Sequence, residues 1–111
     1  MAGKFELTIA ANGKQFYFRL KAANGEPILA SEMYQSKSGA ENGIQSVKTN
    51  ASVDARYERK SASNGQPYFV LKAGNGEPLG KSETYSSTAA MEGGIASVKQ
   101  NAPTALVDDL T

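Results

Sequence analysis

Residues 15–51 read QFYFRLKAANGEPILASEMYQSKSGAENGIQSVKTNA, and residues 66–102 read QPYFVLKAGNGEPLGKSETYSSTAAMEGGIASVKQNA. The two stretches align without a gap, and about 22 of their 37 positions are identical. Agreement of this extent at one fixed offset is the signature of an internal repeat. The chain is therefore a tandem duplication.

The duplication continues upstream, where the offset grows by one residue: Phe5 matches Tyr57, and Asn12 matches Asn64. We divide the chain into a first repeat at 1–52 and a second at 53–111. Because the chain has 111 residues, each repeat is about 50 residues long, a size that buries too little apolar surface to fold well alone. We therefore expect the repeats to share one core across a pseudo-two-fold axis.

Apolar spacing predicts three strands and one helix in each repeat. Phe5, Leu7 and Ile9 alternate with polar residues, which is typical of a half-buried strand. Residues 16–21 form a second predicted strand, and residues 27–32 form a third, which we place at an edge because its first residue is a proline without an N–H. Apolar residues then recur at helical spacing, at Ala40, Ile44, Val47 and Ala51 and again at Met91, Ile95, Val98 and Ala102.

This pattern predicts an α+β fold: two tandem β-β-β-α repeats form one pseudo-two-fold symmetric domain, with an antiparallel sheet packed by two helices. Asn-Gly pairs separate the predicted strands, and both residues of such a turn tolerate a positive φ. Ser36 and Ser87 stand where the helices begin and are predicted as N-caps. Asn50 and Asn101 stand where the helices end and fit the preference for asparagine there.

Gly43 and Gly94 fall in the middle of the predicted helices, where glycine costs about 1 kcal/mol relative to alanine. Both repeats carry this cost. We therefore expect each helix to pack unusually close to the other helix or to the sheet at these positions.

Absent residue types exclude several functions. The chain has no Cys and no His, so it cannot build a Ser-His-Asp triad, a cysteine nucleophile or a His/Cys zinc site. The formal net charge is +1, which gives no strong field toward nucleic acid or an anionic membrane. We expect no cofactor, no metal, no membrane span and no signal peptide, and we expect a cytoplasmic protein.

The runs at 20–51 and 71–102 combine Asn-Gly-Glu with a later Gly-Ile-x-Ser-Val-Lys. They resemble the YegP-like family, small and mostly bacterial proteins of unknown function, in its tandem-duplicated form. The resemblance implies β3-α units joined through a shared sheet, with the strands after each helix exchanged across the pseudo-dyad, at 53–59 and 105–107. The resemblance implies no catalytic residue in this chain, because the family has no established activity.

The second repeat departs from the first at one point of this signature. It has Gly80-Lys81 where the first repeat has Leu29-Ala30. We expect this change to weaken the third strand of the second repeat and to make the two repeats inequivalent.

A carboxylate and a phenol recur before each helix, as Glu32-x-Tyr34 and Glu83-x-Tyr85. Such a pair could bind an anion or do acid-base work. A structural role explains the same residues: the tyrosine rings would pack under the helices and hydrogen-bond at their tips. The two glutamates would then pair with Lys21 and Lys72 on the neighbouring strand.

The second predicted strands orient further candidates. Lys21 and Lys72 must face outward, which places Tyr17 and Arg19 of the first repeat and Tyr68 of the second on the same outward face. Aromatic and basic residues on an open sheet are the elements of a single-stranded nucleic-acid platform.

The sequence thus favours a small non-enzymatic binding or interaction module, in contact through a sheet edge or the groove at the pseudo-dyad. The alternative is single-stranded nucleic-acid binding on the tyrosine-, arginine- and lysine-bearing face, and an enzyme of unknown reaction ranks below both. We expect a monomer with an internal pseudo-dimer.

Overall fold

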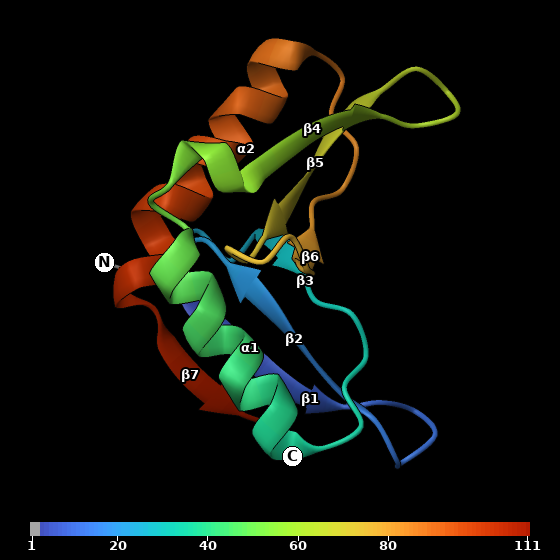
Figure 1. Cartoon of the computed structure of the whole chain (residues 1–111), viewed down its shortest axis with the longest axis vertical. Coiled ribbons are helices and arrows are strands. Elements are labelled where there is room, and N and C mark those ends of the chain that lie inside the picture. The colour runs from blue at the N-terminus through green and yellow to red at the C-terminus, as the bar shows by residue number, and fades with distance from the viewer. Residues whose placement is uncertain (1–2) are drawn as a thin grey trace.

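The structure, a computed structural model, describes residues 3–111, which form one seven-stranded sheet and two α-helices (Figure 1). The strands are β1 (Lys4–Ile9), β2 (Phe16–Lys21), β3 (Pro27–Ala30), β4 (Tyr57–Ser61), β5 (Pro67–Lys72), β6 (Pro78–Lys81) and β7 (Leu106–Asp109). The helices are α1 (Lys37–Asn50) and α2 (Thr88–Asn101), followed by the short 3-10 turns η1 (Asp54–Arg56) and η2 (Ala102–Thr104). The predicted α+β fold with two β-β-β-α repeats is confirmed.

The sheet has the strand order β4-β5-β6-β3-β2-β1-β7. Each repeat contributes an antiparallel three-stranded half, and the halves meet where β3 pairs with β6, at Ala30 and Lys81. The prediction that the third strand lies at an edge is therefore wrong. Pro27 is tolerated because it opens β3, away from that junction, and the strand ends at Ala30 rather than at Glu32.

The strand that follows each helix passes to the other half of the sheet, as the family resemblance implied. The chain leaves α1 through η1 and enters β4, which pairs with β5. It leaves α2 through η2 and enters β7, which pairs in parallel with β1. Lys4 and Lys37 hold β7 there through ion pairs of 3.4 Å to Asp108 and 2.6 Å to Asp109.

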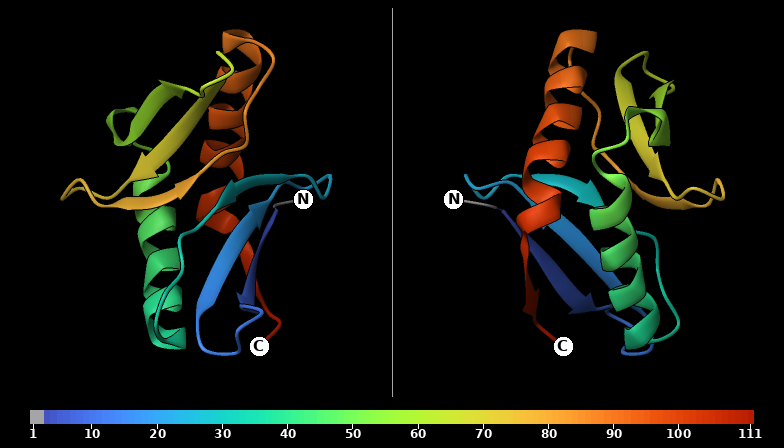
Figure 2. Two further views of the ribbon diagram at one scale, coloured as in Figure 1. Left: turned by 90° about the vertical axis from the view of Figure 1, so that its right-hand side faces the viewer. Right: turned by 60° about the vertical axis from the view of Figure 1, so that its left-hand side comes forward.

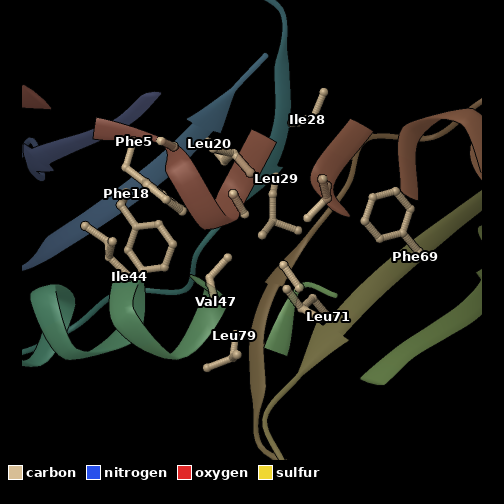
Figure 3. Close-up of a cluster of buried hydrophobic side chains, with 14 of the residues drawn as sticks. Phe5, Phe18, Leu20, Ile28, Leu29, Ile44, Val47, Phe69, Leu71 and Leu79 are labelled. Atoms are coloured by element: carbon tan, nitrogen blue, oxygen red, sulfur yellow. The ribbon is translucent and has the colours of Figure 1, made fainter. Parts of the chain in front are cut away.

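Both helices cover the same face of the sheet (Figure 2). The Lys48 ammonium of α1 lies 5.9 Å from the ring centre of Phe5 on β1, and the Lys99 ammonium of α2 lies 5.6 Å from that of Tyr57 on β4. Figure 3 shows the side chains between these layers in one continuous cluster, from Phe5 in the first repeat to Phe69 in the second. The predicted helical stripes lie in this cluster, whereas Ile9, predicted inward, is 41% exposed at the end of β1.

The strand-connecting turns have one common geometry. Gly13, Gly25, Gly65 and Gly76 have φ between 70° and 87°, and among the described residues positive φ is confined to glycine. Both residues of an Asn-Gly pair tolerate a positive φ, but here only the glycine of each pair adopts one. Each asparagine instead accepts a hydrogen bond through its side chain from a backbone N–H two residues on.

The one-residue change of offset between the repeats lies in the first turn. The Ala10 N–H donates to the Gln15 carbonyl across the β1–β2 turn, whereas its counterpart Ala62 donates to Gln66. The first turn is thus one residue longer, and Lys14, which follows the glycine, is the residue without a counterpart. The insertion stays in the loop and leaves the register of both strands intact.

A serine hydroxyl replaces a backbone carbonyl just after the third strand of each repeat, where Ser31 follows β3 and Ser82 follows β6. The Phe18 N–H donates to the Ser31 hydroxyl at 2.9 Å, and the Phe69 N–H donates to the Ser82 hydroxyl at 3.0 Å. These hydroxyls satisfy backbone donors that would otherwise be buried without a partner. Sequence reasoning did not single out either serine, although both repeats have one at this position.

The helix ends confirm one prediction and correct another. The Ser36 and Ser87 hydroxyls accept from the N–H groups of Gly39 and Ala90, so both are N-caps. Asn50 and Asn101, however, are the last helical residues and not left-handed caps. The Asn101 side chain instead accepts from the Gly3 N–H at 2.9 Å and so fastens the start of β1 to the end of α2.

The mid-helix glycines do mark a close approach: Gly43 lies against Tyr34, and Gly94 lies against Tyr85. A Cβ at Gly43 would overlap the Tyr34 hydroxyl and lie 2.8 Å from Cζ of that ring, and one at Gly94 would meet Tyr85 in the same way. A phenylalanine stacks on each ring, with centroids 6.0 Å apart for Phe18 and Tyr34, and it borders the same glycine: Phe18 Cε2 would lie 3.0 Å from a Cβ at Gly43. The bare glycine backbone is therefore the surface on which the ring packs.

Gly43→Ala is expected to destabilise the protein by about 1–3 kcal/mol, because the methyl group overpacks a filled site. The matched control is Gly93→Ala in α2, where a Cβ would meet nothing within 4 Å. There the better helix propensity should stabilise the protein by up to about 1 kcal/mol. Urea denaturation followed by circular dichroism measures both, and equal effects of the two substitutions would contradict this account.

Candidate functional site

The face of the sheet opposite the helices is open and carries a row of paired positions. The register places these residues side by side across the sheet: Asp108, Glu6, Arg19, Ala30, Lys81, Val70 and Glu58. Side chains directly opposite one another point to the same face. The row therefore has cations on both sides of the central Ala30 and carboxylates toward its ends.

The outer carboxylates are engaged with lysines. Lys21 lies 3.0 Å from Glu6, and Lys72 lies 2.9 Å from Glu58. The expectation that Glu32 and Glu83 pair with these lysines is therefore wrong, because the first strand of each repeat brings a carboxylate nearer. The lysine hydrogen bonds lower the pKa values of Glu6 and Glu58, with burial opposing them.

The two cations beside Ala30 differ from Lys21 and Lys72, which are engaged in ion pairs. Among residues 3–111, Arg19 and Lys81 take part in no ion pair. The Arg19 guanidinium lies 5.7 Å from the centroid of the Tyr17 ring and donates to its hydroxyl at 3.4 Å. Both positive charges are therefore available beside Ala30, whose methyl group leaves the space between them open.

A cleft of about 560 Å³ opens at this point. Its floor is β3, and its walls carry Arg19, Tyr68, Lys81 and Glu83. A second hollow of about 540 Å³ shares Ala30, Tyr68 and Lys81 with it and extends to Glu58 and Lys72. The pseudo-dyad groove predicted from the repeat thus has a place in the fold, on the open face over the β3–β6 junction.

The cleft is asymmetric because of the substitution at Gly80-Lys81. A Cβ at Gly80 would lie 2.9 Å from the Ala30 carbonyl oxygen and 2.9 Å from Cγ of Leu29, its counterpart in the first repeat. The space near the axis therefore holds one leucine side chain and not two. β6 nonetheless has four residues, as β3 does, and the weakening of this strand stays a prediction.

Lys81 is the cleft residue that sequence reasoning missed. Its counterpart in the first repeat is Ala30, and the counterpart of Arg19 is Val70. Each half of the sheet thus contributes one cation, at a position where the other half has a small or apolar residue. The sequence signal for Lys81 was the difference between Gly80-Lys81 and Leu29-Ala30. Without knowledge that β3 pairs with β6, that difference indicates only a weaker strand.

The structure distributes the candidate residues over both faces of the sheet. Arg19, Tyr68 and Glu83 line the cleft, Glu32 and Lys72 line the second hollow, and Tyr17 and Lys21 lie beside them on the open face. Tyr34 and Tyr85 lie under the helices on the other face. Burial raises their pKa values, and the neighbouring Glu32 and Glu83 add to this.

The expected hydrogen bonds at the tips of these tyrosines are not present among the described residues. Tyr57 makes a bond of this kind instead: its hydroxyl donates to the Ala51 carbonyl at 2.6 Å, at the end of α1. Burial raises the Tyr57 pKa far above its ordinary value.

Two general features of the described part of the chain bear on the class of site. No group of three or more His, Cys, Asp or Glu residues there could hold a metal ion. Neither of the α-helices in residues 3–111 has the length and apolar character needed to cross a membrane.

The fold and its open face define a class of protein: a tandem β3-α duplication on one sheet, with both helices on one side. The model of the domain of unknown function DUF1508 matches this chain twice, at residues 11–58 and 62–109. The chain is 53% identical over 111 residues to a UPF0339 protein of Shewanella oneidensis and 51% identical over 111 residues to the UPF0339 protein YegP of Escherichia coli, with all of each chain covered. It belongs to this UPF0339 (YegP) family, whose function is unknown.

Solved structures agree with this fold. The solution structure of the UPF0339 protein from Shewanella oneidensis matches with a TM-score of 0.93 at 53% identity, over 100% of this chain and 93% of that one. The solution structure of Escherichia coli YegP, described as a protein of unknown function, matches with a TM-score of 0.94 at 51% identity, over 100% and 95%.

The ion pairs of the open face predict a pH dependence. Above the ordinary glutamate pKa of 4.5 the pairs of Glu6 and Glu58 stabilise the fold in full, and this stability is lost as the pH falls through their lowered folded pKa values. The double variant Glu6→Gln, Glu58→Gln should therefore lose stability less steeply between about pH 5 and about pH 3.

Urea denaturation at a series of pH values measures this slope. Glu77→Gln, in the exposed β5–β6 turn, is the matched control and should keep the wild-type slope. Identical slopes for the double variant and the wild type would show that these pairs contribute nothing.

Proposed function

We propose that this protein is a non-enzymatic binding module whose contact surface is the open face of the sheet, centred on the cleft over the β3–β6 junction. The observation that supports this most is the presence in that cleft of Arg19 and Lys81, cations that form no ion pair within residues 3–111. A cationic cleft with an apolar floor and a few convergent polar groups is the usual form of a ligand site. The ligand it favours is an anion.

Titration behaviour also supports a module without catalysis. A general acid or base at neutral pH needs a pKa moved toward 7. The carboxyl pKa values that move on the open face, those of Glu6 and Glu58, move down and away from it. The phenol pKa values of Tyr34 and Tyr85 move up, and both groups lie under the helices rather than in the cleft.

Single-stranded nucleic acid is the second candidate for the same face. It is favoured by Tyr17 and Tyr68, which lie on this face of β2 and β5 beside the cations. Bases stack on such rings without sequence preference, and the cations would track the backbone.

Three related points stay predictions within this proposal. The repeats divide at 1–52 and 53–111, and the chain is a monomer, because the second repeat occupies the place that a second copy would otherwise take. The compartment is the cytoplasm, which the absence of cysteine supports.

A pull-down with the full chain tests the proposal, with mass spectrometry of the proteins, small molecules and RNA that it retains. The double variant Arg19→Ala, Lys81→Ala should lose a retained species, whereas Lys14→Ala, a cation in the exposed β1–β2 loop, should keep it. Retention that is the same for all three proteins would contradict a binding site in the cleft.

The same experiment separates the two candidates. If RNA is the species lost with the double variant, its retention by the wild type should fall steeply with salt, because each phosphate contact releases a counterion. Loss of a small molecule or a protein instead would favour the general binding module over the nucleic-acid platform.

A further inference from the structure

The cleft over the β3–β6 junction brings together three kinds of group that one ligand could satisfy at once. Arg19 and Lys81 supply positive charge, Tyr68 supplies an aromatic ring, and Glu83 supplies a carboxylate. They come from β2, β5, β6 and the segment after β6, so the pairing of the two repeats is what assembles them.

The cations are placed to hold one anionic group between them. Arg19 and Lys81 are each paired with Ala30, one from either side. Neighbouring strands are about 4.8 Å apart, so the Cα atoms of the cations lie about 10 Å apart with only a methyl group between them. Both side chains are long enough to meet above Ala30, and arginine is suited to bidentate contact with phosphate.

The rest of the cleft suits a planar ring that carries hydrogen-bond donors. Tyr68 is partly exposed and offers a face for stacking. Glu83 is exposed and takes part in no ion pair among residues 3–111, so its oxygens are available to accept. A carboxylate in a cationic cleft opposes a purely acidic ligand and favours one with its own N–H or O–H donors.

We propose, resting on the proposed function, that this cleft binds a nucleoside phosphate. Its phosphate lies over Ala30 between Arg19 and Lys81, its base stacks on Tyr68, and Glu83 accepts from a sugar hydroxyl or an exocyclic amine. The volume of about 560 Å³ lies within the range of small-molecule sites. An acidic peptide meets the cations equally well but leaves Glu83 opposed to its charge.

The nucleoside phosphate is either free or part of a single strand, and the second hollow distinguishes the two. That hollow adjoins the cleft through Ala30, Tyr68 and Lys81 and reaches Glu58 and Lys72. A free nucleotide fills the cleft alone, whereas a strand of several nucleotides covers both hollows.

The test is an NMR titration of the isotope-labelled full chain with adenosine 5′-monophosphate, adenosine, inorganic phosphate and a short single-stranded oligoadenylate. We expect the monophosphate to shift the amides of Ala30, Lys81 and Glu83 and to bind more tightly than adenosine or phosphate does. The oligoadenylate should also shift Glu58 and Lys72 if the natural source is a strand, and should match the monophosphate if the source is free.

Variants assign the contacts. Arg19→Ala and Lys81→Ala should each weaken binding of the monophosphate about tenfold, and Tyr68→Leu should weaken binding of adenosine by a similar factor. Lys14→Ala should change neither affinity. These exposed or partly exposed positions lie outside the core, so the variants should keep the wild-type amide spectrum elsewhere.

The results separate this inference from the proposed function. If neither the monophosphate nor the oligoadenylate shifts the cleft, while a species in the pull-down still depends on Arg19 and Lys81, the nucleoside phosphate is overturned and the binding module stands. If inorganic phosphate binds as tightly as the monophosphate, or Tyr68→Leu has no effect, the base contact is overturned. If no retained species depends on the cations either, both proposals fail.

Discussion

The pairing of β3 with β6 is the contact on which the rest of the structure depends. It joins two three-stranded halves into one sheet at Ala30 and Lys81. Because the sheet is continuous, both helices pack on one face, and side chains of both repeats form one apolar cluster. A repeat of about 50 residues cannot bury such a core alone, so the junction supplies what each repeat lacks.

The same contact explains one difference between the repeats. Leu29 occupies the space near the pseudo-dyad, and Gly80 is the counterpart that leaves that space to it. The next residue then differs too, so Lys81 faces Ala30 across the junction. Steric exclusion in the core and charge on the open face are thus consequences of one pair of substitutions. Residues of both repeats line the asymmetric cleft, so neither repeat has this surface by itself.

Much of the local structure could be predicted, because it depends on neighbours in the chain. The helical stripes, the serine N-caps and the outward face of β2 follow from spacing and hydrogen-bonding chemistry within a few residues. The mid-helix glycines predicted a close approach, but not that Tyr34 and Tyr85 make it. Errors arose where a partner lies far along the chain: Glu6 displaced Glu32 as the partner of Lys21, and β3 gained β6 on the side that its proline had suggested was free.

By itself, the sequence determined the duplication, the β-β-β-α unit and the exclusion of His- and Cys-based chemistry, because these depend on residue identity and short-range spacing. The tertiary structure decided the order of the strands, the placement of β7 beside β1 and the positions of Arg19 and Lys81 on either side of Ala30. Those features join residues that are distant in the chain. The free energy that selects them is the burial of one shared core, which no local pattern contains.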